Sequence, residues 1–357
     1  IKKCYVPIEN VGECDFIKDL EIIGVENLNQ LVMILATNMK PPEIKIIPQE
    51  TEDYKYDFKN IKGQIQARKA SEIAVAGMHN MLMMGSPGVG KSIIAKTMPS
   101  ILPDMTLEEQ IEISKIQSVA GNLSGSLVKT RPVRSPHHTA TVSAMIGGGF
   151  NPKPGEITQA HGGILFLDEL PEFSRQVIET LRQPLEDEKI IVSRSGGTYE
   201  FPAKFILIGA MNPCKCGYYP DMNKCTCTEQ EVKKYMEKIS GPLIDRIDLC
   251  VHMNQVTYFQ LEKEEQPEDS LTIKERVNRA VQIQRERYAN EKFKFNSQLS
   301  GENIKKYCKL NKEEQHLMEK IYTTMDLSIR AYDKIIKVAR TIADLKQHEK
   351  IQQGDIA

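Results

Sequence analysis

The chain has 357 residues, of which 40% are hydrophobic and 27% are charged, and its formal net charge is −1. This length allows two or more domains with cores of their own, and the composition is typical of an ordinary globular protein. The near-zero charge does not imply a general electrostatic affinity for nucleic acid, so any such contact must come from local basic patches.

The first 60 residues are predicted to lie outside the main domain. A short strand in CYVPIEN and a helix in VENLNQLVMILA indicate the tail of a domain over residues 1–40. The Pro-rich, charged stretch that follows is typical of a linker, over residues 41–60. Because the chain opens at Ile1 and stops in QQGDIA, we expect a segment of a longer protein. No apolar run approaches the ~20 residues of a membrane span, and no signal peptide is visible, so no membrane partner is expected.

Residues 61–250 are predicted to form an α/β domain. A helix in GQIQARKASEIAVAG leads into the first of three apolar runs, each suited to a buried parallel strand. These runs lie at 80–84, 162–170 and 204–212. Their alternation with helical segments is typical of a parallel sheet flanked by helices.

The chain is predicted to turn helical over residues 251–357. SLTIKERVNRAVQIQRERY and SIRAYDKIIKVARTIADL both show helical periodicity. In the second segment, five residues at helical spacing predict one apolar stripe: Ile329, Tyr332, Ile336, Ala339 and Ala343. We therefore expect a second, all-helical domain.

The segment GSPGVGKS fits the phosphate-loop pattern G-x-x-x-x-G-K-[ST] at every fixed position. It also lies between a predicted strand and a predicted helix, which makes a chance Gly-rich loop a poor alternative. Its glycines allow successive backbone N–H groups to face one anion, next to the positive end of the helix. Lys91 is expected to reach the β- and γ-phosphates, and the Ser92 hydroxyl to hold Mg²⁺. The residues assigned to ATP are Gly85, Ser86, Pro87, Gly88, Val89, Gly90, Lys91 and Ser92. A phosphate loop without an export signal predicts a cytoplasmic protein.

Polar residues follow the other two predicted strands. Asp168 would orient Mg²⁺ through its water shell, and Glu169 would polarise the attacking water. Asn212 would hydrogen-bond the γ-phosphate or that water. The structural alternatives are an ordinary strand ending for the acidic pair and a turn-forming Asn before Pro213.

Four of the eight cysteines are clustered in NPCKCGYYPDMNKCTCTEQ, within the loop predicted at 213–228. They are Cys214, Cys216, Cys225 and Cys227. Two C-x-C pairs with Gly, Pro and Asn between them can close tetrahedrally on structural Zn²⁺. Free or redox-active thiols and an iron–sulfur cluster are the alternatives. The loop directly follows Asn212, so it could brace that residue or face a partner.

Taken in order, the motifs resemble one known family. GSPGVGKS, ILFLDELPEF, LRQPLEDEKI, ISGPLIDRIDL and SIRAYDKIIKVARTIADL together are similar to the magnesium-chelatase-like AAA+ ATPases of the ComM (YifB) type. The resemblance runs from about residue 5 to the end. It implies an AAA+ P-loop core with a C-terminal helical lid. It also implies that residues 1–40 are the remnant of an N-terminal domain similar to the Lon protease fold.

The resemblance assigns roles to further residues. It places Gly85–Ser92 at Walker A, Asp168 and Glu169 at Walker B, and Asn212 at sensor 1. Arg246 falls at the arginine-finger position, donated to a neighbouring subunit, and Arg330 at sensor 2. From the residues alone, these would be a loop arginine and a solvated helix residue.

Two insertions of the family are also recognisable, at 131–163 and 189–205. The second has strand-like halves around Ser195-Gly196-Gly197, which predicts a hairpin. In related rings such elements face the central channel, so four basic residues are candidate contacts for a phosphodiester backbone: Arg131, Arg134, Arg194 and Lys204. A solvated loop and an ordinary hairpin are the equal alternative. For His137 and His138 we expect a structural hydrogen-bonding role rather than a shared metal.

The resemblance implies a homo-hexameric ring motor driven by ATP, with helicase or branch-migration activity on single-stranded or branched DNA in natural transformation and recombination. Two other functions stay open. One is a protein-remodelling ATPase of the chelatase type, and the other is an ATP-gated binding module that hydrolyses slowly.

Overall fold

The computed structural model describes residues 2–14, 20–37, 54–123, 127–149, 152–194, 197–257 and 267–356, without the side chains of residues 12, 13 and 194. By its contacts the chain divides into two units. The first comprises Ile1–Asp53 and Met105–Arg131, and the second comprises Tyr54–Asp104 and Pro132–Ala357. The second unit holds nearly all of the predicted site residues. The predicted domain boundaries themselves stay predictions, and most of the predicted linker lies outside the described residues.

The first unit contains a small parallel pair of strands and two longer helices. β1 (Lys3–Pro7) pairs in parallel with β2 (Glu21–Val25), and α1 (Leu28–Thr37) follows. The strand in CYVPIEN and the helix in VENLNQLVMILA are therefore confirmed, while β2 was not predicted. α4 (Leu107–Ala120) begins at a capping box, in which Thr106 and Glu109 each bond the backbone of the other.

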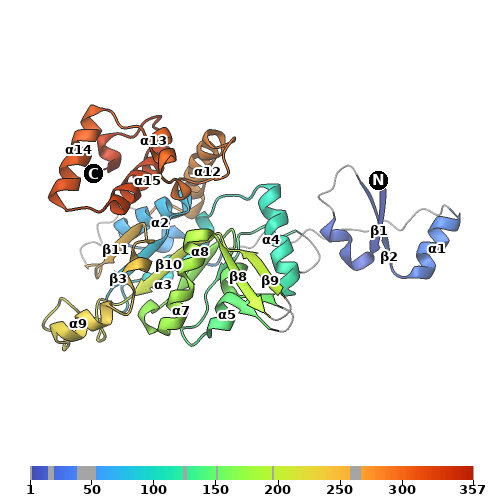
Figure 1. The fold of residues 1–357 in the computed structure, drawn as a ribbon, viewed down its shortest axis with the longest axis horizontal. Coiled ribbons are helices and arrows are strands. Elements are labelled where there is room, and N and C mark those ends of the chain that lie inside the picture. The colour runs from blue at the N-terminus through green and yellow to red at the C-terminus, as the bar shows by residue number, and fades with distance from the viewer. Residues whose placement is uncertain are drawn as a thin grey trace. The chain divides into compact units, whose positions relative to one another are not determined.

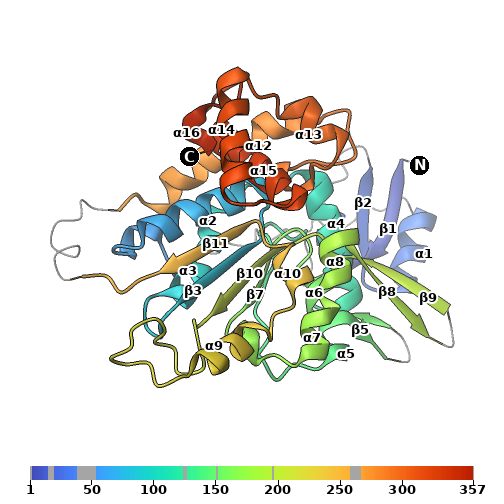
Figure 2. The same cartoon turned by 60° about the vertical axis from the view of Figure 1, so that its left-hand side comes forward.

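The second unit is built on a parallel sheet of five strands in the order β11-β3-β10-β7-β4. Figure 1 shows β11, β3 and β10 of this sheet, and Figure 2 shows β7 as well. β3 (Met81–Gly85), β7 (Ile164–Leu167) and β10 (Ile206–Met211) are the three predicted strands. β4 (Val133–Arg134) and β11 (Leu249–Met253) form the two edges and were not predicted. All neighbouring strands run parallel, which confirms the predicted fold class.

Alternate residues of the central strands enter two different cores. In β10, Ile206 and Ile208 pack into one core, and Leu207 packs into the other. β7 divides its side chains in the same way, since the two faces of a strand alternate along the chain. Both faces of the sheet are therefore covered, which explains why these strands read as continuous apolar runs.

Helices cover both faces of the sheet. α2 (Ile65–Gly77), α3 (Lys91–Thr97) and α12 (Ser270–Arg287) contribute to the first core, and α7 (Arg175–Thr180) contributes to the second. The remaining short helices of this part are α5 (Val142–Ile146), α6 (Glu156–Gln159), α8 (Arg182–Asp187), α9 (Glu229–Met236) and α10 (Gly241–Ile244).

Two small antiparallel pairs complete the sheet domain. β8 (Lys189–Arg194) pairs with β9 (Gly197–Pro202), and Arg194 lies opposite Gly197, which confirms the predicted hairpin. Residues 195 and 196 of its predicted turn lie outside the described residues. β5 (Gly147–Gly148) pairs with β6 (Lys153–Pro154) inside the predicted insertion at 131–163.

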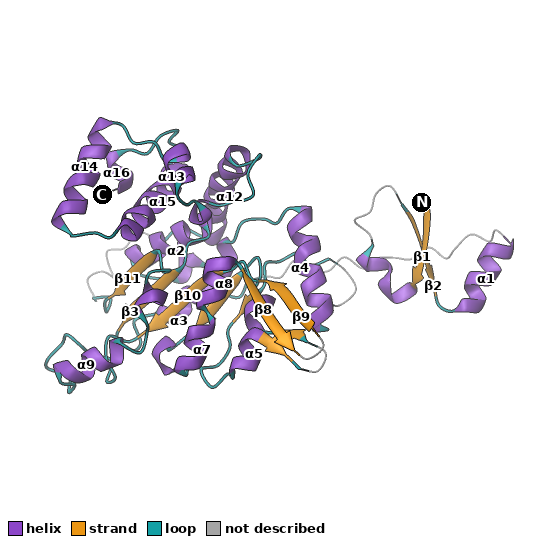
Figure 3. Ribbon diagram, in the orientation of Figure 1, coloured by secondary structure: helices purple, strands orange, loops and turns teal. Residues whose placement is uncertain are grey.

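The C-terminal region is helical from α12 onward, as predicted (Figure 3). Its further helices are α13 (Glu302–Tyr307), α14 (Lys312–Thr324), α15 (Ile329–Leu345) and α16 (Gln353–Ile356). The predicted stripe of α15 is buried at Ile336, Ala339 and Ala343, but Ile329 is 73% exposed. The stripe prediction is wrong at Ile329 because this residue opens the helix, about two turns before the first buried residue, Ile336. Within the described ranges, no helix combines the length and apolar character needed to cross a bilayer.

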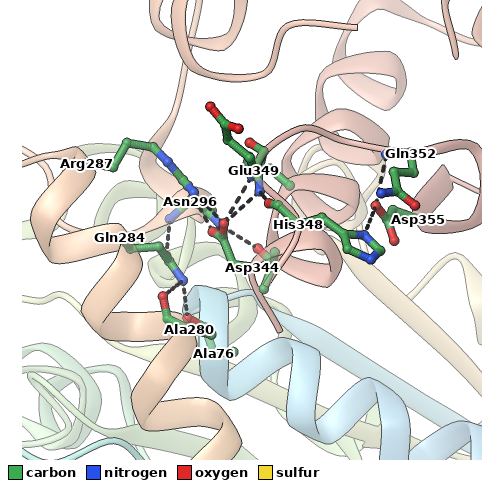
Figure 4. Close-up of polar contacts among 12 residues, drawn as sticks. Ala76, Ala280, Gln284, Arg287, Asn296, Asp344, His348, Glu349, Gln352 and Asp355 are labelled. Atoms are coloured by element: carbon green, nitrogen blue, oxygen red, sulfur yellow. Dashed lines mark hydrogen bonds and ion pairs between the residues drawn. The ribbon is translucent and has the colours of Figure 1, made fainter. Parts of the chain in front are cut away.

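A buried polar network joins the sheet domain to the helical region (Figure 4). Gln284 of α12 donates to the carbonyl oxygen of Ala76, at the end of α2, over 2.9 Å. Its own Oε1 accepts from the backbone N–H of Asn296, and Asn296 Nδ2 donates to Asp344 over 2.9 Å. Arg287 pairs with the same carboxylate. Three segments far apart in the sequence are thus held by specific hydrogen bonds as well as by apolar packing.

Candidate functional site

The predicted phosphate loop lies between β3 and α3. Gly88 and Gly90 have φ angles of +81° and +101°, which residues with a Cβ rarely adopt. Gly85 has a different constraint, since a Cβ there would lie 2.4 Å from the carbonyl oxygen of Met253 in β11. Gly88 and Gly90 therefore allow the backbone of the turn, and Gly85 allows β3 to approach β11 closely.

Lys91, the first residue of α3, lies almost fully buried beneath this loop. Its Nζ donates to the carbonyl oxygens of Gly85 and Ser86 over 2.5 and 3.0 Å, and to Oδ1 of Asn212 over 3.0 Å. Burial lowers the pKa of Lys91, although the charges of Asp168 and Glu169 act in the opposite direction. The structure thus brings together the predicted lysine and the predicted polar residue that directly follows β10.

The acidic pair meets the same edge of the sheet. Oγ of Ser92 donates to Oδ2 of Asp168 over 2.7 Å, so the two predicted Mg²⁺ ligands are direct neighbours. This proximity follows from the strand order, because β10 lies between β3 and β7 and all three end at one edge. Hydroxyl and carboxylate oxygens are the donors that Mg²⁺ prefers.

Glu169 has an unusual backbone and a neighbour that the sequence did not place at the site. Its φ angle is +51°, a left-handed conformation that is uncommon outside glycine and that concentrates at functional sites. Nδ1 of His138 lies 3.6 Å from its Oε2, and the ring of His138 stacks near that of His137. His138 could have been placed near Glu169 from its position just after β4, which pairs with β7. However, β4 is only two residues long and was not recognised in the sequence.

The two predicted arginines bind acidic side chains. Arg246 donates to the carbonyl oxygen of Pro242 over 2.7 Å and pairs with Glu186. Arg330, which is largely exposed, donates to Asp245 over 3.2 Å. Asp245, the partner of Arg330, directly precedes Arg246 in the chain, but the side chain of Arg246 is only 15% exposed. Glu186 and Asp245 are carboxylates that the sequence reading did not associate with these arginines.

The four basic residues predicted to contact nucleic acid have different surroundings. Arg134 bonds both carboxylate oxygens of Glu156, and Lys204 pairs with Glu188 over 3.3 Å. Arg131 belongs to the first unit, where its side chain is 2% exposed and paired with Glu109. That position does not favour Arg131 as a phosphate contact. The side chain of Arg194 lies outside the described residues.

The four cysteines of the 213–228 loop converge as predicted. All four Sγ atoms lie within 4.8 Å of one another, and Cys214 Sγ lies 3.3 Å from that of Cys216 and 3.8 Å from that of Cys225. A tetrahedral zinc site with Zn–S bonds of about 2.3 Å needs sulfur atoms about 3.8 Å apart. The donor set and spacing therefore fit a tetrahedral thiolate site.

The backbone around the cluster favours a thiolate at Cys216. Hydrogen bonds from the backbone at Tyr218 and Thr226 lower the pKa of Cys216 to about 6. At Cys225 and Cys227 a backbone hydrogen bond also acts to lower the pKa, but burial and the neighbouring thiols outweigh it and raise the pKa of both. Backbone donors of this kind orient metal-binding thiolates and stabilise their charge. If a metal ion binds here, Cys214, Cys216, Cys225 and Cys227 are the residues that would hold it.

Two family models match the chain. The model of magnesium chelatase, subunit ChlI, matches residues 57–261, and the model of the C-terminal part of the same subunit matches residues 267–357. The first covers the phosphate loop, the acidic pair and the cysteine cluster, and the second covers most of the helical region.

Individual relatives agree with these models. The competence protein ComM of Haemophilus influenzae is 38% identical over 356 residues, which is 98% of this chain and 69% of the relative. The uncharacterized protein YifB of Escherichia coli is 41% identical over 298 residues, covering 83% of this chain and 58% of YifB. More distantly, a protein of Arabidopsis thaliana named probable DNA helicase MCM9 is 26% identical over 230 residues, covering 64% of this chain and 29% of that protein. The chain thus spans 58% to 69% of the length of its ComM and YifB relatives.

Proposed function

Because the chain belongs to the magnesium-chelatase-like AAA+ family of the ComM and YifB type, we propose that it is a Mg²⁺-dependent ATPase working as a ring motor on DNA. The site residues proposed for ATP are the phosphate loop Gly85–Ser92 with Asp168, Glu169 and Asn212. The observation that carries the proposal is the meeting of Lys91 with Asn212, and of Ser92 with Asp168, at one edge of the sheet.

Each residue has a chemical role in this proposal. Lys91 neutralises the β- and γ-phosphates, and Ser92 and Asp168 position Mg²⁺. Glu169 orients the attacking water, and Asn212 detects the γ-phosphate from the adjacent strand. Electrostatic stabilisation and positioning account for most of the catalysis of phosphoryl transfer. These residues supply most of that stabilisation, and the arginines described next complete the site.

Arg246 is proposed to complete the site of a neighbouring subunit, and Arg330 is proposed as sensor 2 on the helical lid. A guanidinium is a delocalised fork that matches the charge developing on the transferred phosphoryl group. Arg246 now binds Glu186, and would exchange this carboxylate for a neighbour's nucleotide. The proposal thus includes a homo-hexameric ring in the cytoplasm.

DNA is the proposed substrate of the motor, with helicase or branch-migration activity. The support is the likeness to a competence protein over 98% of the chain, and the more distant likeness to a protein named as a DNA helicase. Arg134, Arg194 and Lys204 stay as candidate phosphate contacts, while the buried Arg131 is left out. The net charge of −1 is compatible with this, because a ring repeats a small basic patch around one channel.

A chelatase-type remodelling ATPase is the second candidate, favoured by the match to the ChlI model. The test is the ATPase rate with and without single-stranded or forked DNA at two salt concentrations. Stimulation by DNA that weakens at the higher salt supports the DNA motor. Turnover that DNA does not change would reject the DNA motor in favour of remodelling, and ATP binding with negligible turnover would indicate an ATP-gated binding module.

Zinc, proposed as a structural ion of the cysteine cluster, is checked by metal analysis of the purified protein.

A further inference from the structure

The cysteine loop touches the phosphate loop directly. Gly217, two residues after Lys215, is buried and has a φ angle of +89°. A Cβ at this position would lie 2.6 Å from Cδ and 2.8 Å from Cγ of Pro87, and 3.8 Å from Cγ of Asn212. One turn of the cysteine loop therefore packs against two parts of the nucleotide site, and only glycine fits there.

The thiol cluster holds that turn in place. The N–H of Gly217 donates to the carbonyl oxygen of Cys214 over 3.0 Å, and the N–H of Tyr219 donates to the Sγ of Cys214 over 3.4 Å. Cys216, the residue before Gly217, has its Sγ 3.5 Å from that of Cys225. Cysteines of the cluster flank the turn on both sides. A metal ion held by all four thiolates, which we call the closed cluster, would therefore restrain the position of Gly217. The same turn lies against Asn212, the residue whose side chain binds Lys91.

We infer that metal binding by the four cysteines and nucleotide binding by the phosphate loop are energetically coupled through the contact of Gly217 with Pro87. A closed metal site holds the phosphate loop and Asn212 in position, so it raises the affinity for nucleotide. By linkage, bound nucleotide must raise the affinity for the metal by the same factor. The inference rests on the proposed ATP site. It adds a regulatory role to a cluster that would otherwise stabilise only its own loop.

The reciprocal effect gives a readout that is independent of ATP turnover. The zinc-loaded protein is titrated with a chromogenic zinc chelator, and the fraction of zinc released at equilibrium is measured with and without saturating, non-hydrolysable AMP-PNP and Mg²⁺. We expect the nucleotide to raise the zinc affinity obtained from this release about fivefold or more, which is the lower range of typical coupling between sites. Lys91→Ala protein with the same nucleotide controls for zinc binding by AMP-PNP itself.

Substitutions at the contact separate coupling from simple loss of structure. Pro87→Ala removes the ring that meets Gly217, and should reduce the effect of nucleotide on zinc release to less than about twofold. Pro267→Ala, at a proline outside the proposed ATP site, should retain the effect. Gly217→Ala should also uncouple the sites. Gly121→Ala controls for the backbone strain of an alanine at positive φ, since Gly121 has a φ angle of +81° and open space around a Cβ.

The outcomes distinguish the inference from the proposed function. A fluorescence titration on the same preparation measures nucleotide binding directly. Binding without any change in zinc release overturns the inference alone, as does an unchanged effect in Pro87→Ala. Absence of nucleotide binding overturns the proposed function and the inference with it, and a protein that neither carries nor takes up zinc overturns the inference.

Discussion

Replacing Asp344 with asparagine should destabilise the protein far more than its conservative shape suggests. The carboxylate of Asp344 is fully buried and is shared by two arginines. Arg287 donates to Oδ2 over 2.9 Å, and Arg340 donates to Oδ1 over 3.1 and 2.8 Å from Nε and Nη2. Asn296 adds a further hydrogen bond from its side-chain amide.

The size of the effect follows from this geometry. An asparagine has one acceptor oxygen and no charge, so it leaves two guanidinium groups without their counter-ion and faces at least one donor with its own N–H₂. Breaking a buried ion pair by removing one partner costs about 3–5 kcal/mol. For a domain of this size, each kcal/mol lowers Tm by roughly 2–4 °C, so Asp344→Asn should lower Tm by roughly 6–20 °C.

The assay is thermal unfolding followed by circular dichroism at 222 nm, with Asp245→Asn as the matched control. Asp245 also pairs with an arginine, Arg330, but both side chains are well exposed. Such surface pairs contribute about 1 kcal/mol or less, so the control should lose under about 4 °C. If Asp344→Asn unfolds within 4 °C of wild type, as the control does, the buried network does not hold the helical region in the way described.

Two further predictions concern the arginine finger and the response to acid. Arg246→Ala should lower the ATPase rate by roughly 1000-fold or more if the finger acts on a neighbour's nucleotide. Mixing it with Lys91→Ala should restore activity, because each variant supplies what the other lacks; no recovery on mixing would contradict action between subunits. At Asp248, burial raises the pKa, but the hydrogen bond and charge of His79, with the charge of Lys337, outweigh it and leave the pKa below its ordinary value. The ionised carboxylate therefore stabilises the fold at pH values above its unfolded pKa of about 3.9, and this contribution is lost as the pH falls through the folded pKa. Asp248→Asn should lower Tm at pH 7, and the difference in Tm from the wild type should become smaller towards pH 3. A Tm difference of equal size at both pH values would contradict the lowered pKa of Asp248.

The sequence was most informative where one local pattern determines the structure. The strands ending at Gly85, Leu167 and Met211 were recognised because both of their faces are buried, which gives continuous apolar runs. The phosphate loop and the C-x-C pairs were recognised because their chemistry depends on fixed spacing. Their mutual placement also followed from the sequence, since parallel strands end at one edge.

The sequence was least informative where contacts join distant residues. The edge strands β4 and β11 are short or only partly buried, so they lack a continuous apolar signal. Arg340 and Asp344 are buried within α15, and nothing local in the sequence marks Arg287 as a partner of Asp344. Similarly, the contact of Gly217 with Pro87 joins loops 130 positions apart in the numbering and depends on the strand order of the sheet.

The most direct test of the account is equilibrium binding of a fluorescent ATP analogue with Mg²⁺ to the wild type, Lys91→Ala and Glu169→Gln. We predict that the wild type and Glu169→Gln bind with similar affinity and that only the wild type hydrolyses ATP at an appreciable rate. Lys91→Ala should bind about 100-fold more weakly, because it loses a charge-assisted contact worth about 3 kcal/mol. Binding by Lys91→Ala as tight as that of the wild type would contradict the assignment of the nucleotide site.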